Sequence, residues 1–105
     1  ELTHQVAVDD VFNTFDVLAA PTMATVAGPI DRDFREWSRG FSSSQLGVAG
    51  NTAGLPGMTM PMGIGELNLP TGMQLVTRAG AENLLLAIAA EYQRRTDWHQ
   101  RHPAV

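Results

Sequence analysis

The stretch over residues 51–78 constrains the fold most, because it concentrates the residues that fix backbone geometry. It contains five of the chain's ten glycines and three of its six prolines, placed around two short apolar runs at residues 58–62 and 73–76. Glycine supplies positive φ at turns, and proline fixes φ near the value that turns require. This spacing predicts a hairpin-like pair of strands bounded by turns.

Composition limits what the chain can be. With 105 residues, 44% hydrophobic and 17% charged, it is long enough and apolar enough to form one domain or part of one. The net charge of -4 comes from scattered acids and seven basic residues without a block of like charge, so we expect neither nucleic acid nor a membrane as a partner. The absence of cysteine excludes disulfides and thiolate catalysis.

No segment has the character of a membrane span or a targeting signal. The longest uncharged stretch, residues 40–65, is interrupted by prolines, serines and glycines, which argues against a transmembrane helix. No signal peptide is recognisable, and we expect a cytoplasmic protein. The first residue is Glu1 rather than methionine, so we expect a longer parent chain.

The first half of the chain predicts a helix followed by a buried strand. Apolar residues recur with approximate helical spacing over residues 2–15 and favour a helix of ~12 residues. The run at residues 17–20 has no polar alternation and stops at Pro21, which predicts a strand covered on both faces by helices.

Residues 23–39 predict an exposed connection with a helical turn near residues 34–37. Trp37 can pack in the core or line the wall of a substrate pocket, because its side chain is too large to leave in water. The serines at residues 42–44 have no base beside them in the sequence, so they favour the cap of a short helix over a nucleophile.

The clearest helix is predicted for residues 81–95, which are rich in alanine and leucine. Leu86 and Ala90 widen its apolar face, which predicts more cover than a surface helix receives. Thr96 is expected to cap a short turn that follows, and Trp98 to fold back on the preceding apolar surface.

Two histidines near the end of the chain raise the question of a metal site. His99 and His102 are spaced i, i+3 near Asp97, which could place ligands on one helical face. Pro103 ends the helix there and a fourth ligand is missing, so we expect an exposed polar terminus and no metal site.

Together these elements predict an α/β fold of about three strands and three to four helices, with residues 1–105 forming one segment of a single domain. A buried strand at residues 17–20 needs neighbours that this chain does not supply, so we expect part of a larger mixed β-sheet covered by helices. Open sheet edges also make a homo-oligomer possible.

Several blocks of sequence, taken in order, resemble the C-terminal portion of the amidase signature family. They are residues 51–63 (Asn-Thr-Ala-Gly-Leu-Pro-Gly-Met-Thr-Met-Pro-Met-Gly), residues 69–76 (Leu-Pro-Thr-Gly-Met-Gln-Leu-Val), and a leucine-rich helix ending in Tyr92 and followed by Thr96-Asp-Trp-His. Residues 16–22, Asp-Val-Leu-Ala-Ala-Pro-Thr, resemble the family's aspartate-led strand. The likeness covers nearly the whole chain except residues 23–40.

The resemblance implies hydrolysis of carboxylic amides or related C–N bonds within an α/β fold. Members use a serine nucleophile, a second serine and a lysine base, because a neutral lysine in a dry site can accept a proton. This chain contains no lysine, and its seven basic residues are arginines, which do not deprotonate in proteins. The catalytic residues are therefore expected outside the chain, and no catalytic residue, metal or cofactor is assigned to it.

The resemblance also suggests which residues approach a small-molecule amide substrate. The candidate substrate-binding residues are Trp37, Phe41, Asn51 and Thr52. Met62 and Thr71 stand where other residues are common in the family, which leaves the class of amide open.

Three functions stay open. The chain could be the C-terminal segment of an amidase whose partner is the N-terminal portion of the same enzyme, with the segment itself inactive. It could belong to the related A-type amidotransferase component, which releases ammonia from glutamine for transfer onto misacylated tRNA. It could instead be a non-catalytic binding or interaction module that reuses the sub-fold. If the natural gene product is several times longer than this chain and contains lysine upstream of it, the binding or interaction module is the wrong interpretation.

Overall fold

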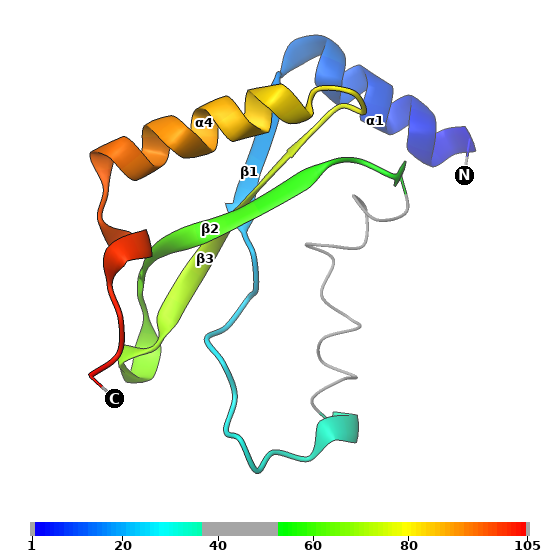
Figure 1. The fold of residues 1–105 in the computed structure, drawn as a ribbon. Helices are drawn as coiled ribbons and strands as arrows, with labels where there is room; N and C mark the ends of the chain where they lie inside the picture. The colour runs from blue at the N-terminus through cyan, green and yellow to red at the C-terminus, as the bar shows by residue number, and fades with distance from the viewer. Residues whose placement is uncertain (1, 37–52, 105) are drawn as a thin grey trace.

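The computed structural model describes residues 2–36 and 53–104 and has the predicted α/β fold (Figure 1). The structure contains α1 (Leu2–Thr14), β1 (Val17–Pro21), β2 (Gly57–Ile64), the 3-10 turn η1 (Glu66–Asn68), β3 (Pro70–Thr77), α4 (Glu82–Arg95) and the 3-10 turn η2 (Trp98–Gln100). Residues 34–36 are also helical, within the turn expected near residues 34–37. The two long helices and three strands expected from the sequence are confirmed, with ends that shift by a few residues.

The three strands form one antiparallel sheet in the order β1-β3-β2. β2 and β3 make the hairpin that the glycine and proline pattern predicts, with Met58 opposite Leu75. At the turn, Leu67 and Asn68 adopt positive φ values of 56° and 59°. Asparagine tolerates this conformation, whereas leucine rarely adopts it.

The core lies between one face of the sheet and α4. Met60, Leu75 and Leu85 are almost fully buried in one cluster, and partly buried hydrophobic residues pack around it: Val17, Met58, Met73, Ile88, Ala89 and Tyr92. Strand alternation brings Met60 and Leu75 to the same face, and helical spacing turns Leu85 toward them. Figure 1 shows α4 lying across the sheet.

Polar contacts join the end of α1 to the end of β3. Thr77 is fully buried, and its hydroxyl donates a hydrogen bond of 2.8 Å to the backbone carbonyl oxygen of Asp16. The Arg78 guanidinium donates to the carbonyl oxygen of Phe12 at 3.2 Å and lies 3.8 Å from the Asp16 carboxylate. Carbonyl groups in the last turn of a helix lack intrahelical partners, so a cation is well placed there.

The described residues do not supply the cover that was expected on both faces of residues 17–20. Among the described residues β1 pairs with β3 alone, and Leu18 is 41% exposed. The cover expected over Leu86 is likewise missing from the described residues, because this side chain is 57% exposed. An apolar run predicts that a strand or helix is buried, but it does not show whether other residues of the same chain cover it.

The end of the chain differs in detail from the sequence prediction. Thr96 is the C-cap of α4, and its hydroxyl donates back to the carbonyl oxygen of Tyr92 at 2.9 Å. It therefore does not cap η2, which begins after Asp97 without a side-chain cap. Trp98 does turn back, and its ring lies beside Gly63 of β2.

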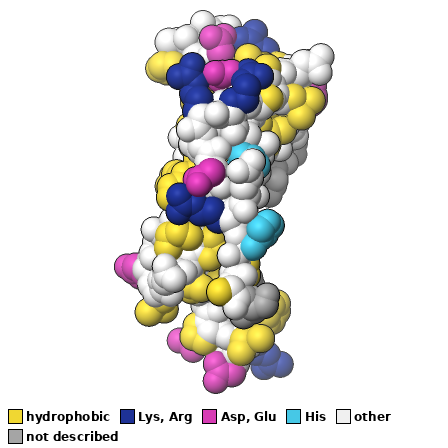
Figure 2. Space-filling model, turned by 60° about the vertical axis from the view of Figure 1, so that its left-hand side comes forward, with side chains coloured by type: hydrophobic (Ala, Val, Ile, Leu, Met, Phe, Trp, Pro, Cys, Tyr) yellow, Lys and Arg dark blue, Asp and Glu magenta, His cyan; other side chains and the backbone are white. Residues whose placement is uncertain are grey.

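The molecule is thin and exposes many large apolar side chains. Its principal extents are 44 × 38 × 16 Å, which leaves room for about two layers. The exposed apolar residues include Phe15, Leu18, Ile30, Phe34, Ile64, Leu67 and Leu86. Figure 2 shows hydrophobic side chains reaching the surface between charged groups. None of the helices in the described ranges is both long and apolar enough to cross a membrane.

Candidate functional site

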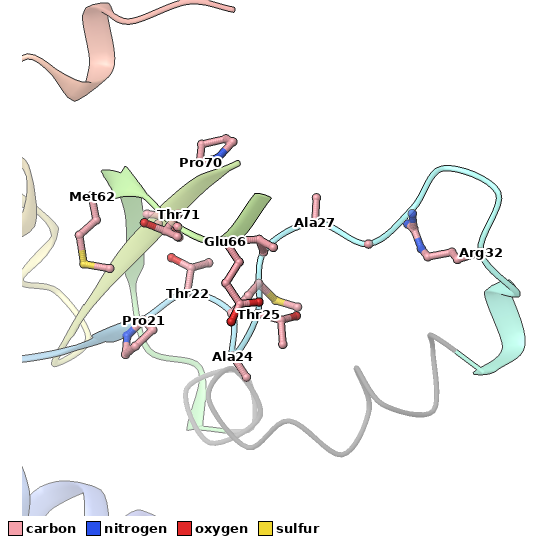
Figure 3. A pocket seen from close by; sticks show the side chains of 16 residues that line it. Pro21, Thr22, Ala24, Thr25, Ala27, Arg32, Met62, Glu66, Pro70 and Thr71 are labelled. Carbon is pink, nitrogen blue, oxygen red and sulfur yellow. The ribbon is translucent and has the colours of Figure 1, made fainter. Parts of the chain in front are cut away.

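A groove of about 610 Å³ opens beside the turn end of the hairpin (Figure 3). One wall is the segment that follows β1, and the other is formed by the ends of β2 and β3 with the turn between them. The lining residues are Pro21, Thr22, Met23, Ala24, Thr25, Val26, Ala27, Gly28, Arg32, Thr59, Met62, Gly65, Glu66, Pro70, Thr71 and Gly72.

Strand direction explains why these residues meet. β1 ends at Pro21 and β3 begins at Pro70, and each proline is followed by a threonine. Because β1 and β3 are antiparallel, the end of one lies at the start of the other. The backbone N–H of Thr22 donates to the carbonyl oxygen of Gly72 at 2.9 Å and fixes this junction. Thr22 and Thr71 therefore stand in the same groove.

Two glycines let the walls approach closely. A Cβ at Gly65 would lie 2.8 Å from Cγ2 of Thr71, which is closer than packed carbon atoms come, and 3.1 Å from Cγ1 of Val26, which is a tight contact. A Cβ at Gly72 would lie 3.0 Å from the Thr22 hydroxyl oxygen. The width of the groove depends on the absence of side chains at both positions.

A bulge in β2 brings Met62 into the wall. Pro61 lies opposite Gly72 and Gly63 opposite Thr71, so Met62 is the extra residue on its strand. A bulge bends a strand and redirects its side chains. Met62 adds a flexible apolar surface to a groove that otherwise offers mainly threonines and small residues.

Threonine hydroxyls supply most of the polar chemistry of the groove. Four threonines line it, at positions 22, 25, 59 and 71. The Thr22 hydroxyl oxygen is buried and has no hydrogen-bond partner among the described residues. A buried hydroxyl without a partner is costly, so the partner of Thr22 is to be sought outside the described residues.

The groove also carries one cation and one anion among its described lining residues. Arg32 donates to the carbonyl oxygen of Pro29 at 3.0 Å, and Glu66 is exposed on the hairpin turn. The described lining contains no serine, histidine, lysine or cysteine. These residues therefore have the donors and acceptors to bind a polar small molecule, but no nucleophile paired with a base.

A second hollow of about 600 Å³ lies between α1 and residues 53–55. Its lining includes Asp9, Phe12 and Arg78. Arg78 is already bonded to the end of α1, as described above, so the residues described around this hollow offer no uncommitted cation.

All four predicted substrate-binding residues, Trp37, Phe41, Asn51 and Thr52, lie outside the described residues, as do the serines at 42–44. Sequence reasoning missed Thr22 and Thr71 as a pair. The signal was two Pro-Thr dipeptides at the ends of strands, which meet only once the antiparallel pairing is known. His99 and His102 join no group of three or more potential metal ligands in the ranges that the structure covers.

The sequence of this chain is similar to that of a known protein family. The sequence model of the family described as Amidase matches residues 3–86. This chain belongs to the amidase family. The match includes β1, both strands of the hairpin and the first turn of α4. It stops before η2 and the residues that follow.

Curated relatives of this amidase-family chain are the A components of glutamyl-tRNA(Gln) amidotransferases. The one from Chloroflexus aggregans is 41% identical over 95 residues, which are 90% of this chain and 19% of that protein. The protein of the same name from Roseiflexus sp. is 44% identical over 92 residues, 88% of this chain and 19% of its own length. The Gloeothece citriformis protein is 37% identical, with 90% and 20% covered. The chain thus spans about a fifth of the length of these relatives.

Proposed function

We propose that this chain is the C-terminal part of an enzyme that hydrolyses carboxylic amide C–N bonds, and that the serine nucleophile and lysine base lie in a portion outside it. Family membership supports the reaction class. The composition supports the placement of the catalytic residues outside this chain, because a chain without lysine cannot supply an amine base. The partner of these residues is then the N-terminal portion of the same protein.

The observation that carries this proposal is the groove at the hairpin end. Its described lining has hydroxyl groups and an apolar wall but no reactive pair, which suits a surface that holds the amide substrate while other residues attack it. The exposed apolar side chains, and the edge of β1 that pairs with no other described strand, suit contact with further strands and helices of the parent. A larger mixed sheet follows from the same reasoning.

The second candidate is the amidotransferase function that the names of the relatives describe. Identities of 37–44% over most of this chain favour it. In that case the amide would be glutamine, and the ammonia released would pass to a glutamyl-tRNA. A substrate charged to tRNA would also place the protein in the cytoplasm. A homo-oligomer is compatible with either candidate.

The test uses the full-length natural protein that contains this segment. Ammonia release is measured with a simple aliphatic amide, an aryl amide and glutamine, each with and without glutamyl-tRNA. Turnover of the simple amides without tRNA supports the hydrolase. Ammonia release that occurs with glutamine but with neither simple amide, and that glutamyl-tRNA stimulates, supports the amidotransferase. No release from any substrate would contradict both and favour a binding module.

A further inference from the structure

The short turn η2 packs against the hairpin close to the groove. A Cβ at Gly63 would lie 3.9 Å from Cζ2 of Trp98, which is ordinary contact distance. A larger side chain at Gly63 would occupy the space of the indole ring. Trp98 is only partly exposed, so β2 covers much of a side chain that is costly to leave in water.

Arg101 holds the indole ring from another side. Its guanidinium carbon lies 4.2 Å from the ring centroid of Trp98. The same guanidinium pairs with the Asp97 carboxylate at 3.0 Å. A cation over an indole face is attracted by the ring, and the aspartate limits where that cation can move. We call Asp97, Trp98 and Arg101 the Trp98 clamp.

The clamp reaches the groove through one strand pair. Gly63, against which Trp98 packs, lies opposite Thr71, and a Cβ on Gly63 would be 3.8 Å from the Thr71 hydroxyl oxygen. Thr71 and the bulged Met62 both line the groove. Gly63, which has no side chain, therefore lies between the indole ring of Trp98 and Thr71 of the groove wall.

We propose that Trp98, held by Arg101, is a positioning residue that fixes the turn end of the hairpin and so sets the width of the substrate groove. The proposal rests on the proposed function of the groove, because it assigns to the clamp an effect on substrate binding. A bulge and a turn with two positive-φ residues make this end of the hairpin the least regular part of the described sheet, and an external contact can stabilise it. The clamp residues lie after residues 3–86, which the family model matches, and Asp97 and Trp98 belong to the Thr96-Asp-Trp-His block that carries part of the resemblance.

The first measurement is amide hydrogen exchange of the full-length protein, and it does not depend on activity. We expect Trp98→Ala to speed exchange in residues 62–71 by about tenfold, with exchange in β1 unchanged. Arg101→Ala is expected to give a smaller increase in the same residues. Arg94→Ala is the matched control, because Arg94 also forms an exposed pair, with Glu91, but lies on α4 and not in the Trp98 clamp. Unchanged exchange in residues 62–71 would overturn the proposal.

The second measurement separates positioning from general stability. With an amide that the wild-type protein hydrolyses, Trp98→Ala should raise KM about tenfold and leave kcat within about twofold, because the reactive groups lie elsewhere. Trp98→Phe, which keeps a flat ring on Gly63, should restore most of the lost affinity. An equal fall of kcat in both variants, with KM unchanged, would contradict the proposal.

The two measurements test the proposed function and the role of the Trp98 clamp separately. If the wild-type protein hydrolyses no amide, the proposed function fails, while hydrogen exchange still decides whether the clamp fixes the hairpin. If Trp98→Ala does not fold, Arg101→Ala provides the comparison, because it removes the cation over the ring and is expected to speed exchange in the same residues. Wild-type exchange in residues 62–71 of Arg101→Ala would then count against the clamp.

Discussion

Thr77 and Thr22 both have partly or fully buried side chains, but one serves the stability of the fold and the other lies in the groove. The Thr77 hydroxyl has a partner in the Asp16 carbonyl oxygen, whereas the Thr22 hydroxyl oxygen has none among the described residues. A paired buried hydroxyl stabilises the fold, and an unpaired one is costly unless something else bonds it. The first therefore belongs to the junction of α1 and β1, and the second to the groove.

Replacing Thr77 with valine keeps the shape of the side chain but removes the hydrogen bond. We expect Thr77→Val to lower the free energy of unfolding of the full-length protein by about 1–3 kcal/mol, because the Asp16 carbonyl oxygen is left without its partner. Denaturant titration measures this change. Thr14→Val, at an exposed site at the end of α1, is the control and should change the stability by less than about 0.5 kcal/mol. Equal effects of the two substitutions would contradict the assigned role.

Gly65 is predicted to be intolerant of any side chain. Gly65→Ala places a methyl group 2.8 Å from Thr71, so the turn must move away from Val26. We expect a loss of about 1–3 kcal/mol in unfolding free energy and weaker substrate binding. Gly57→Ala is the matched control in the same hairpin, because its Cβ would meet nothing closer than 3.7 Å among the described residues. Similar effects of the two substitutions would show that the close approach at Gly65 is unimportant.

Among the helices and strands, local sequence predicted what each element is, but not what covers it. The hairpin followed from glycine and proline positions, and α4 from its alanine and leucine content. The cover of β1 and of Leu86 could not be predicted, because apolar sequence specifies burial without naming the partner. The groove was missed for a related reason: Thr22 and Thr71 are 49 residues apart, and strand pairing alone brings them together.

In the last turns of α4, two arginines next to Glu91 are predicted to lower the pKa of its carboxyl group measurably. Glu91 bonds to Arg94 and Arg95, and these two cations lower the pKa of its carboxyl group from the ordinary value of 4.5, with Arg94 the larger cause. The folded pKa is below the unfolded one, so any stability that the pair contributes is present above pH 4.5 and is lost as the pH falls through the folded pKa.

Nuclear magnetic resonance titration of Glu91 measures this pKa directly. Arg94→Ala should raise it toward 4.5 by more than Arg95→Ala does. Because the groups are exposed, high salt should also raise it. A Glu91 pKa that neither substitution changes would contradict the ion-pair explanation.

The molecule as a whole is too thin to bury its own apolar residues. Among residues 6–36 and 53–104, only four hydrophobic residues are buried: Phe12, Met60, Leu75 and Leu85. The large exposed hydrophobic residues outnumber them. A domain of this length normally buries more than half of the surface of its unfolded chain in a continuous core. The proposed remainder of the parent protein would supply the missing cover.

This lack of cover predicts the behaviour of residues 1–105 expressed alone. We expect the isolated chain to aggregate or oligomerise, because one edge of β1 has no partner among the described strands and apolar side chains reach solvent. Size-exclusion chromatography with light scattering measures the state of association. A monodisperse monomer that melts cooperatively would contradict the expectation.

The most direct test is a comparison of amide hydrolysis by the full-length protein and by residues 1–105 alone, with the same substrate and equal molar amounts. The proposed division of labour predicts turnover by the full-length protein and none by the isolated chain, which has no lysine to act as base. Turnover by purified residues 1–105 would contradict it and would place the catalytic groups within this chain.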